Sequence, residues 1–239
     1  MKKTLLVLFS LSISFLAISQ SSSSTKIDLT NRPADHFMIQ YGSDSWTNRP
    51  DSVRTGGFSR HFNIYFMTDK PFKSNPKLSV AFGVGLGTSN MFFKNTNVDL
   101  KSTSANLPFT NTDSTNHFNK YKLTTIYAEV PVELRYYSNP ANPGKSWKAA
   151  IGLKVGTLLK SYTKGKNLLN KGGQSVYGTG YIEKESNKRF LNGTMLAVTG
   201  RIGLGFISLD AGYQINSVLK DGVGPSMNKF SLGVTFSGL

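Results

Sequence analysis

Charged side chains recur at alternate positions within Tyr127–Tyr137, and this spacing sets the chemistry that the chain could carry. An extended backbone sends alternate residues to one face, so Glu129, Glu133 and Arg135 would share a face. Other segments bring ionisable groups to the equivalent face. The full set is Glu129, Glu133, Arg135, Lys148, Lys154, Arg201 and Asp210.

Buried charges of opposite sign should pair, because an unpaired buried charge is strongly destabilising. We therefore interpret the set as a salt-bridged structural network in a filled interior. Two alternatives stay open: a gated ion or proton path, and a catalytic pair of carboxylates. The catalytic pair is disfavoured, because Asp210 lies on a different segment from Glu129 and Glu133.

The three histidines, His36, His61 and His117, are the other candidates for catalysis. His36 and His61 begin neighbouring segments, and no nucleophile motif accompanies either of them. No His or carboxylate pair has a metal-ligand spacing, and the glycines of Gly83–Gly87 sit mid-strand without a following helix. We expect a protein that is not an enzyme, with no catalytic residue, cofactor or metal site.

The segment Leu78–Thr88 best shows which elements would position these groups. Its large apolar residues are Leu78, Val80, Phe82, Val84 and Leu86, and its small ones are Ser79, Ala81, Gly83, Gly85 and Gly87. A strict period of two indicates a β-strand with two different faces. One face suits lipid and the other suits the crowded lumen of a narrow barrel. The pattern therefore predicts a strand that spans an outer membrane.

Seven further segments show comparable alternation, which gives eight strands in all. The predicted ranges are 35–42, 58–67, 78–92, 120–137, 147–159, 191–206, 207–217 and 229–236. Connections after the second, fourth and sixth strands are shorter than most of the others, as expected for periplasmic turns and outer loops. The predicted fold is all-β, an eight-stranded antiparallel up-and-down transmembrane β-barrel. Pro131 requires a local irregularity such as a bulge in its strand.

The N-terminus predicts export. Lys2 and Lys3 precede an apolar, Ser-rich core, and Ala17-Ile18-Ser19 supplies small residues for cleavage before Gln20. We expect a signal peptide at 1–19, a flexible segment at 20–34 and the barrel domain at 35–239. The short core disfavours the alternative of a membrane anchor helix. The absence of cysteine excludes a lipid-anchored lipoprotein and disulfides.

The formal net charge of +15 indicates anionic partners. Export makes nucleic acid an unsuitable partner, so outer-membrane lipid and lipopolysaccharide are expected, with other envelope proteins as possible partners. Much of the charge falls in the predicted long loop 160–189, the best candidate for a binding role. Its cations are Lys160, Lys164, Lys166, Lys171, Lys184, Lys188 and Arg189.

The chain resembles the small outer-membrane β-barrel proteins of Bacteroidetes, the PorT-like family. The resemblance covers nearly all of the mature chain. It rests on the Ile-Ser-Gln junction, YAEVPVELRYY at 127–137, AAIGLKVGTLL at 149–159, RIGLGFISLDAGYQ at 201–214 and FSLGVTF at 230–236. It implies the barrel architecture and, by analogy with the founding member, a link to protein secretion.

Three functional hypotheses follow. The first is a non-enzymatic structural or interaction barrel of the bacterial outer membrane, whose basic loop contacts lipopolysaccharide or partner proteins. The second is a PorT-like accessory factor in secretion or envelope assembly. The third is a membrane-embedded lipid-modifying enzyme. A soluble secreted barrel competes for the fold, but its strands should carry polar residues on the outside.

Overall fold

The computed structural model describes residues 37–238. The predicted signal peptide at 1–19, the segment at 20–34 and His36 lie outside the described residues, as does Leu239. No helix within 37–238 is long and apolar enough to cross a membrane.

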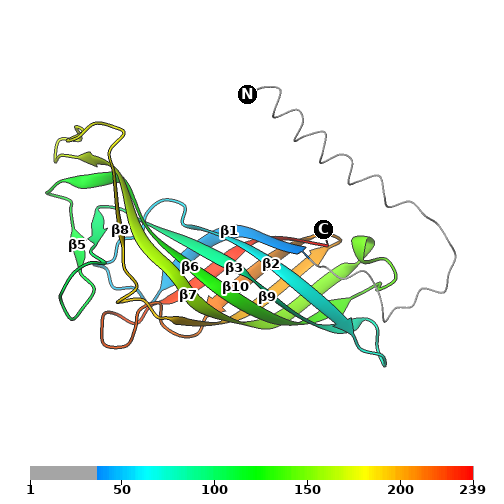
Figure 1. Cartoon of the computed structure of the whole chain (residues 1–239). Coiled ribbons are helices and arrows are strands. Elements are labelled where there is room, and N and C mark those ends of the chain that lie inside the picture. The colour runs from blue at the N-terminus through cyan, green and yellow to red at the C-terminus, as the bar shows by residue number, and fades with distance from the viewer. Residues whose placement is uncertain (1–36, 239) are drawn as a thin grey trace, which may run out of the picture.

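Eight long strands form one closed antiparallel ring (Figure 1). They are β1 (Phe37–Thr47), β2 (Arg60–Pro71), β3 (Leu78–Phe93), β6 (His117–Tyr137), β7 (Trp147–Leu169), β9 (Thr194–Leu204), β10 (Ile207–Gln214) and β11 (Asn228–Ser237). Each strand pairs with its neighbours in sequence, β1 pairs with β11, and the β6–β7 ladder completes the ring. The predicted eight-stranded up-and-down barrel is confirmed.

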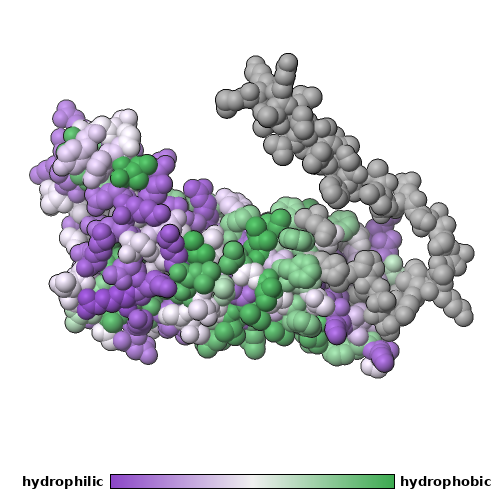
Figure 2. Space-filling model, viewed as in Figure 1, coloured by the Kyte–Doolittle hydropathy of each residue, from purple (hydrophilic) through white to green (hydrophobic). Residues whose placement is uncertain are grey.

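The two faces of β3 separate as its alternation predicts. Ser79 and Ala81 are fully buried inside the ring, whereas Phe82, Val84 and Leu86 stand 46 to 61% exposed on the outside. Similar outward residues on the other strands form the apolar band visible over the middle of the barrel in Figure 2. An exterior of this kind is stable against acyl chains and unfavourable in water.

The two ends of the barrel differ. The turns at 72–77, 138–146 and 205–206 are short, and the second contains the 3₁₀ turn η2 (Pro143–Lys145). The connections at the other end, the loop end, are mostly longer. One holds the hairpin of β4 (Thr96–Val98) and β5 (Phe109–Asn111), and another holds β8 (Ile182–Ser186).

The predicted bounds of two long connections, 93–119 and 160–189, were partly wrong. β7 continues to Leu169 instead of ending at Leu159, and β8 pairs with it along 162–166. β6 likewise begins at His117. These extensions rise beyond the apolar band into water, so large apolar residues are no longer required on their outer face. The predicted loop 160–189 is therefore largely a β-ribbon.

The irregularity expected around Pro131 is present in the adjoining ladder. Pairing between β3 and β6 runs to Phe82–Val132 and resumes at Gly85–Glu129, so it skips the level of Pro131, which lacks an N–H group. The register shift on the β7 side lies elsewhere, between Ile126 and Tyr127.

The loops close the barrel mouth with an apolar core of their own, which we call the apolar cap. Its loop residues are Val53, Val98, Leu100, Leu107, Phe190, Leu191, Val218 and Leu219, and it packs on strand residues such as Met91, Leu123 and Met195. Backbone hydrogen bonds join the loops: Leu107 donates to Val223 (2.8 Å) and Lys220 donates to Phe190 (3.0 Å). The loop end is thus one packed unit.

Candidate functional site

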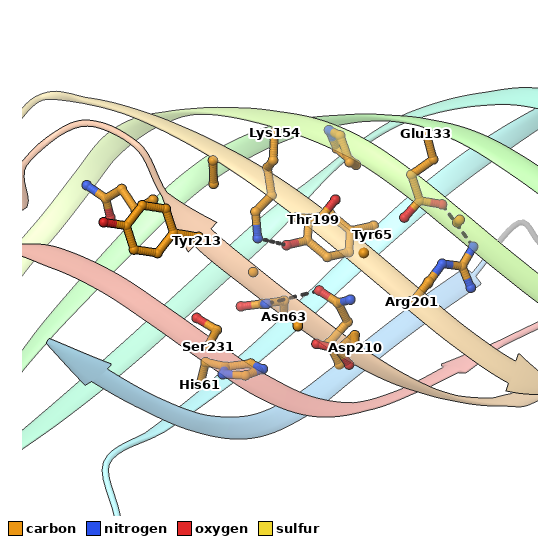
Figure 3. Close-up of a pocket in the computed structure, with 18 of the residues that line it drawn as sticks. His61, Asn63, Tyr65, Glu133, Lys154, Thr199, Arg201, Asp210, Tyr213 and Ser231 are labelled. Carbon is orange, nitrogen blue, oxygen red and sulfur yellow. Dashed lines mark hydrogen bonds and ion pairs between the residues drawn. The ribbon is translucent and has the colours of Figure 1, made fainter. Parts of the chain in front are cut away.

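The first ionic group of the lumen consists of Tyr65, Glu129 and Lys154, from β2, β6 and β7. The Lys154 ammonium lies 3.0 Å from the Glu129 carboxylate. It also donates to the Tyr65 hydroxyl at 3.0 Å (Figure 3). Tyr65 in turn donates to Glu129. Each buried polar group in this triad has a partner, which is the condition for tolerating charge in a dry interior.

The second group is centred on Glu133. Its Oε2 accepts from Nε of Arg135 at 2.8 Å and from a terminal nitrogen of Arg201 at 2.9 Å. Arg201 also donates to Ser237 Oγ at 3.3 Å. The side chains of all three ionic residues are at most 6% exposed. One carboxylate therefore holds two guanidinium groups that come from different strands.

Asp210 occupies a separate position in the lumen. Although it lies opposite Arg201 in the β9–β10 register, its carboxylate accepts from Thr235 at 2.7 Å. Gln40 donates to the same threonine at 3.0 Å. The structure thus places all seven predicted charged residues inside the barrel but divides six of them among three groups. The seventh, Lys148, lies apart from these groups, with its ammonium 5.1 Å from the centre of the Tyr137 ring.

A fourth group was not predicted, because His61 was considered only with His36. His61 Nδ1 lies 2.8 Å from the buried Asp44 carboxylate. Ser231 donates to Asp44 at 2.7 Å, and Ser89 donates to its other oxygen. A histidine that activates a serine nucleophile must accept that serine's proton. Here both serine hydroxyls donate to Asp44 and not to the histidine. The serines therefore fix the Asp44 carboxylate, which in turn orients His61.

Little free volume remains among these groups. The cavity between His61, Lys154, Arg201 and Asp210 has a volume of about 40 Å³, which holds a few water molecules. The apolar cap covers the same lumen at the loop end. The interior is consequently a packed polar core closed on its outer side.

The seven predicted loop cations lie in three kinds of position. Lys160, Lys164 and Lys166 are on β7, Lys184 is on β8, and Lys171, Lys188 and Arg189 are in the connections. Arg189 donates to the carbonyl of Ser102 at 2.9 Å, so it joins two loops of the apolar cap. The remaining cations are lysines displayed on or near the ribbon.

The ribbon formed by β7 and β8 separates charge between its faces. Lys122, Lys164 and Lys184 lie side by side in register across β6, β7 and β8. Glu183 and Glu185 alternate with Lys184 and so point to the opposite face. Burial, and then the charge of nearby Asp99, raise the pKa of the Glu185 carboxyl. The outward face of the ribbon is therefore basic.

A closed ring with an apolar outer band and an ion-paired interior defines a membrane-spanning β-barrel. Residues 18–237 match the family model described as outer membrane protein beta-barrel domain, and the chain belongs to that family. This membership places the protein in the bacterial outer membrane. None of the curated proteins matches the sequence.

Two solved structures show the extent of structural similarity. Ail, the attachment invasion locus protein of Yersinia pestis, is 14% identical with a TM-score of 0.34; the alignment covers 84% of this chain and 96% of Ail. Neisserial surface protein A is 13% identical with a TM-score of 0.32, and the alignment covers 86% of this chain and 99% of that protein.

Proposed function

We propose that this protein is a non-enzymatic barrel of the outer membrane with a structural or interaction role, exported through a signal peptide cleaved before Gln20. Its basic outer surface contacts lipopolysaccharide. The observation that carries the proposal is the separation of charge on the β7–β8 ribbon, where lysines point outward and glutamates point inward. A cationic wall beyond the lipid band faces the anionic headgroups of the outer leaflet.

The packed lumen supports a role without transport or catalysis. Each carboxylate described above accepts hydrogen bonds from neighbouring side chains, and the apolar cap lies above them. A conducting path would need a continuous chain of water along the barrel, and a central cavity of about 40 Å³ holds only a few molecules. We expect no conductance in planar bilayers. Conductance that Glu129→Gln alters would instead support the proton-path hypothesis.

Lipopolysaccharide binding tests the proposal directly. The variant combines Lys160→Gln, Lys171→Gln, Lys184→Gln and Lys188→Gln. Since each lysine near an anionic surface contributes about 1 kcal/mol, we expect at least about tenfold weaker binding of lipid A, with strong salt dependence. A matched control removes four lysines at the short-turn end: Lys70, Lys73, Lys77 and Lys145. Unchanged binding in the first variant would refute the proposal.

A second candidate is an accessory role in secretion or envelope assembly, as in PorT-like proteins. The tip of the ribbon favours it, because Val176, Tyr177 and Ile182 are 40 to 66% exposed outside the apolar band. Exposed apolar groups beyond the membrane suit contact with another protein. Replacing the three by serine should abolish a partner that co-purifies with the wild-type protein from native membranes, while a triple alanine control inside the lipid band (Val84, Leu86 and Val132) retains it.

A further inference from the structure

A shallow concavity lies on the outer wall of the barrel where β2, β3, β6 and β7 run side by side. Its volume is about 190 Å³, and its lining consists of Arg60, Phe92, Lys120, Lys122, Lys164 and Lys166. Five of these six side chains are cationic and none is acidic. Arg60, Lys120 and Lys122 belong to strands outside the predicted basic loop.

The lysines of this concavity face one another across two neighbouring strands. Lys120 lies directly opposite Lys166, and Lys122 lies directly opposite Lys164, in the β6–β7 register. Like charges in such cross-strand positions destabilise a sheet. Burial lowers the pKa of Lys122, which stands above the lipid band. Tyr162 opposes this shift, and repulsion from Arg60 and Lys164 lowers the pKa further. The wall therefore lacks the counter-charge that would make this arrangement favourable.

Two of the five cations, Arg60 and Lys122, are already held in place around one aromatic ring. The Arg60 guanidinium lies 5.3 Å from the centre of the Phe92 ring, and the Lys122 ammonium lies 5.8 Å from it. Lys122 also donates to Asn90 Oδ1 at 2.6 Å, and Thr124 donates to the same oxygen at 2.9 Å. Fixed cations lose less conformational entropy on binding an anion than freely rotating ones do.

The concavity stands at the depth of lipid headgroups. Phe62 is the outward residue of the lipid band that lies nearest the loop end on β2. Arg60 is the next outward residue toward the loop end, about 7 Å further along the strand. A larger groove of about 470 Å³ adjoins it and shares Arg60, Phe92 and Lys120. The remaining wall of that groove includes Phe58, Phe118 and Leu169. The cationic concavity thus continues into an amphipathic groove.

We propose that this concavity binds a phosphate group of an outer-leaflet glycolipid, with the sugar of that lipid in the adjoining groove. The inference rests on the proposed function and deepens it, because it assigns lipopolysaccharide contact to one built site in place of a diffuse basic surface. The phosphate neutralises the opposed lysine pairs and accepts hydrogen bonds from Arg60, while Phe92 supports the cations from below.

The test compares two double variants of the full mature chain in detergent. Lys122→Gln with Lys164→Gln removes one opposed pair, and Lys171→Gln with Lys188→Gln removes the same charge elsewhere on the loop end. Each is titrated with bisphosphorylated lipid A and with its dephosphorylated form. We expect lipid A to bind the first variant at least tenfold more weakly than it binds the second. The dephosphorylated lipid should bind the wild type at least tenfold more weakly.

Several outcomes overturn the inference, and they are distinguishable from failure of the proposed function. Equal weakening in both double variants refutes the site but leaves general contact with lipopolysaccharide intact. Absence of lipid A binding by the wild type refutes both. Inorganic phosphate that competes as strongly as lipid A shows recognition of free phosphate and overturns the glycolipid assignment.

A measurement without ligand guards against misfolded variants. Because Lys122→Gln with Lys164→Gln relieves repulsion, it should raise the unfolding midpoint of the lipid-free protein by about 1–3 °C. Conversion of the same two lysines to arginine should keep lipid A binding within about threefold of the wild type. A lower midpoint in the glutamine variant would contradict the reading of these lysines as mutually repelling.

Discussion

Gly87 on β3 and Glu129 on β6 occupy one small volume of the lumen. A Cβ atom on Gly87 would overlap the Glu129 carboxylate, so the absence of a side chain at 87 makes room for the acid. Gly85 stands in the same relation to the ring of Tyr65. The glycines of β3 therefore leave the space that the Tyr65–Glu129–Lys154 group fills.

Gly87→Ala should destabilise the barrel by about 1–3 kcal/mol, because the added methyl group displaces a carboxylate that holds Lys154. Gly212→Ala is the matched control, since its Cβ would meet its nearest neighbours at 3.8 Å. Denaturant unfolding in lipid vesicles measures both. Equal stability of the two variants would show that the lumen at 87 adjusts freely.

The positions of the lumen charges could be predicted from sequence, because a period of two assigns faces without knowledge of partners. Their pairing could not. Glu133 binds Arg135 of its own strand and Arg201 of β9, and the second contact depends on ring order and register. Asp210 shows the same limit, since it faces Thr235 although Arg201 is its strand partner.

The packing of the loop end could not be predicted from periodic patterns in the sequence. Val53, Leu100 and Leu107 are scattered apolar residues in polar segments, so no period marks them as a core. The extension of β7 did leave a signal. Ser161, Thr163 and Gly165 are small and buried, and they alternate with larger outward residues just as in β3. The signal was missed because those outward residues are polar where the strand leaves the lipid.

Glu133→Gln should destabilise the protein strongly, because it leaves the buried guanidinium groups of Arg135 and Arg201 without their shared counter-charge. Breaking a buried ion pair in this way costs about 3–5 kcal/mol. Denaturant unfolding measures the loss. Glu183→Gln, which removes an acid from the exposed ribbon, is the control and should change stability by less than about 0.5 kcal/mol. A similarly small effect at Glu133 would contradict its role as the centre of this group.

We expect the contact of Asp113 with Arg54, which joins two loops, to be sensitive to acid. Hydrogen bonds from Asn95 (2.7 Å) and Arg54 lower the pKa of the Asp113 carboxyl below its ordinary value of 3.8. The folded loop then binds fewer protons than the unfolded one, so this stabilisation is present above 3.8 and is lost as pH falls through the lowered pKa. Pepsin cleavage of this loop should accelerate between about pH 4 and pH 2, beyond the enzyme's own pH dependence. Asp113→Asn should lose that acceleration, whereas Asp221→Asn in another loop should keep it.

The apolar cap makes the loops resistant to proteases in a way that one side chain can test. Phe190 is fully buried in the cap, and the backbone carbonyl of the same residue accepts from Lys220 of a neighbouring loop. Phe190→Ala leaves a cavity and should destabilise the packed cap by about 3–5 kcal/mol. If the loops open together, the open population should rise by more than about tenfold, since 1.4 kcal/mol corresponds to one factor of ten.

Trypsin added outside proteoliposomes measures this opening, because Lys101, Arg189 and Lys220 border the cap. Cleavage at all three sites should accelerate together in Phe190→Ala. Tyr177→Ala is the control, since it truncates an aromatic ring that is 66% exposed in the same connection between β7 and β9. Acceleration at Arg189 alone would show that the loops open independently. The cap would then be a set of separate contacts and not one packed unit.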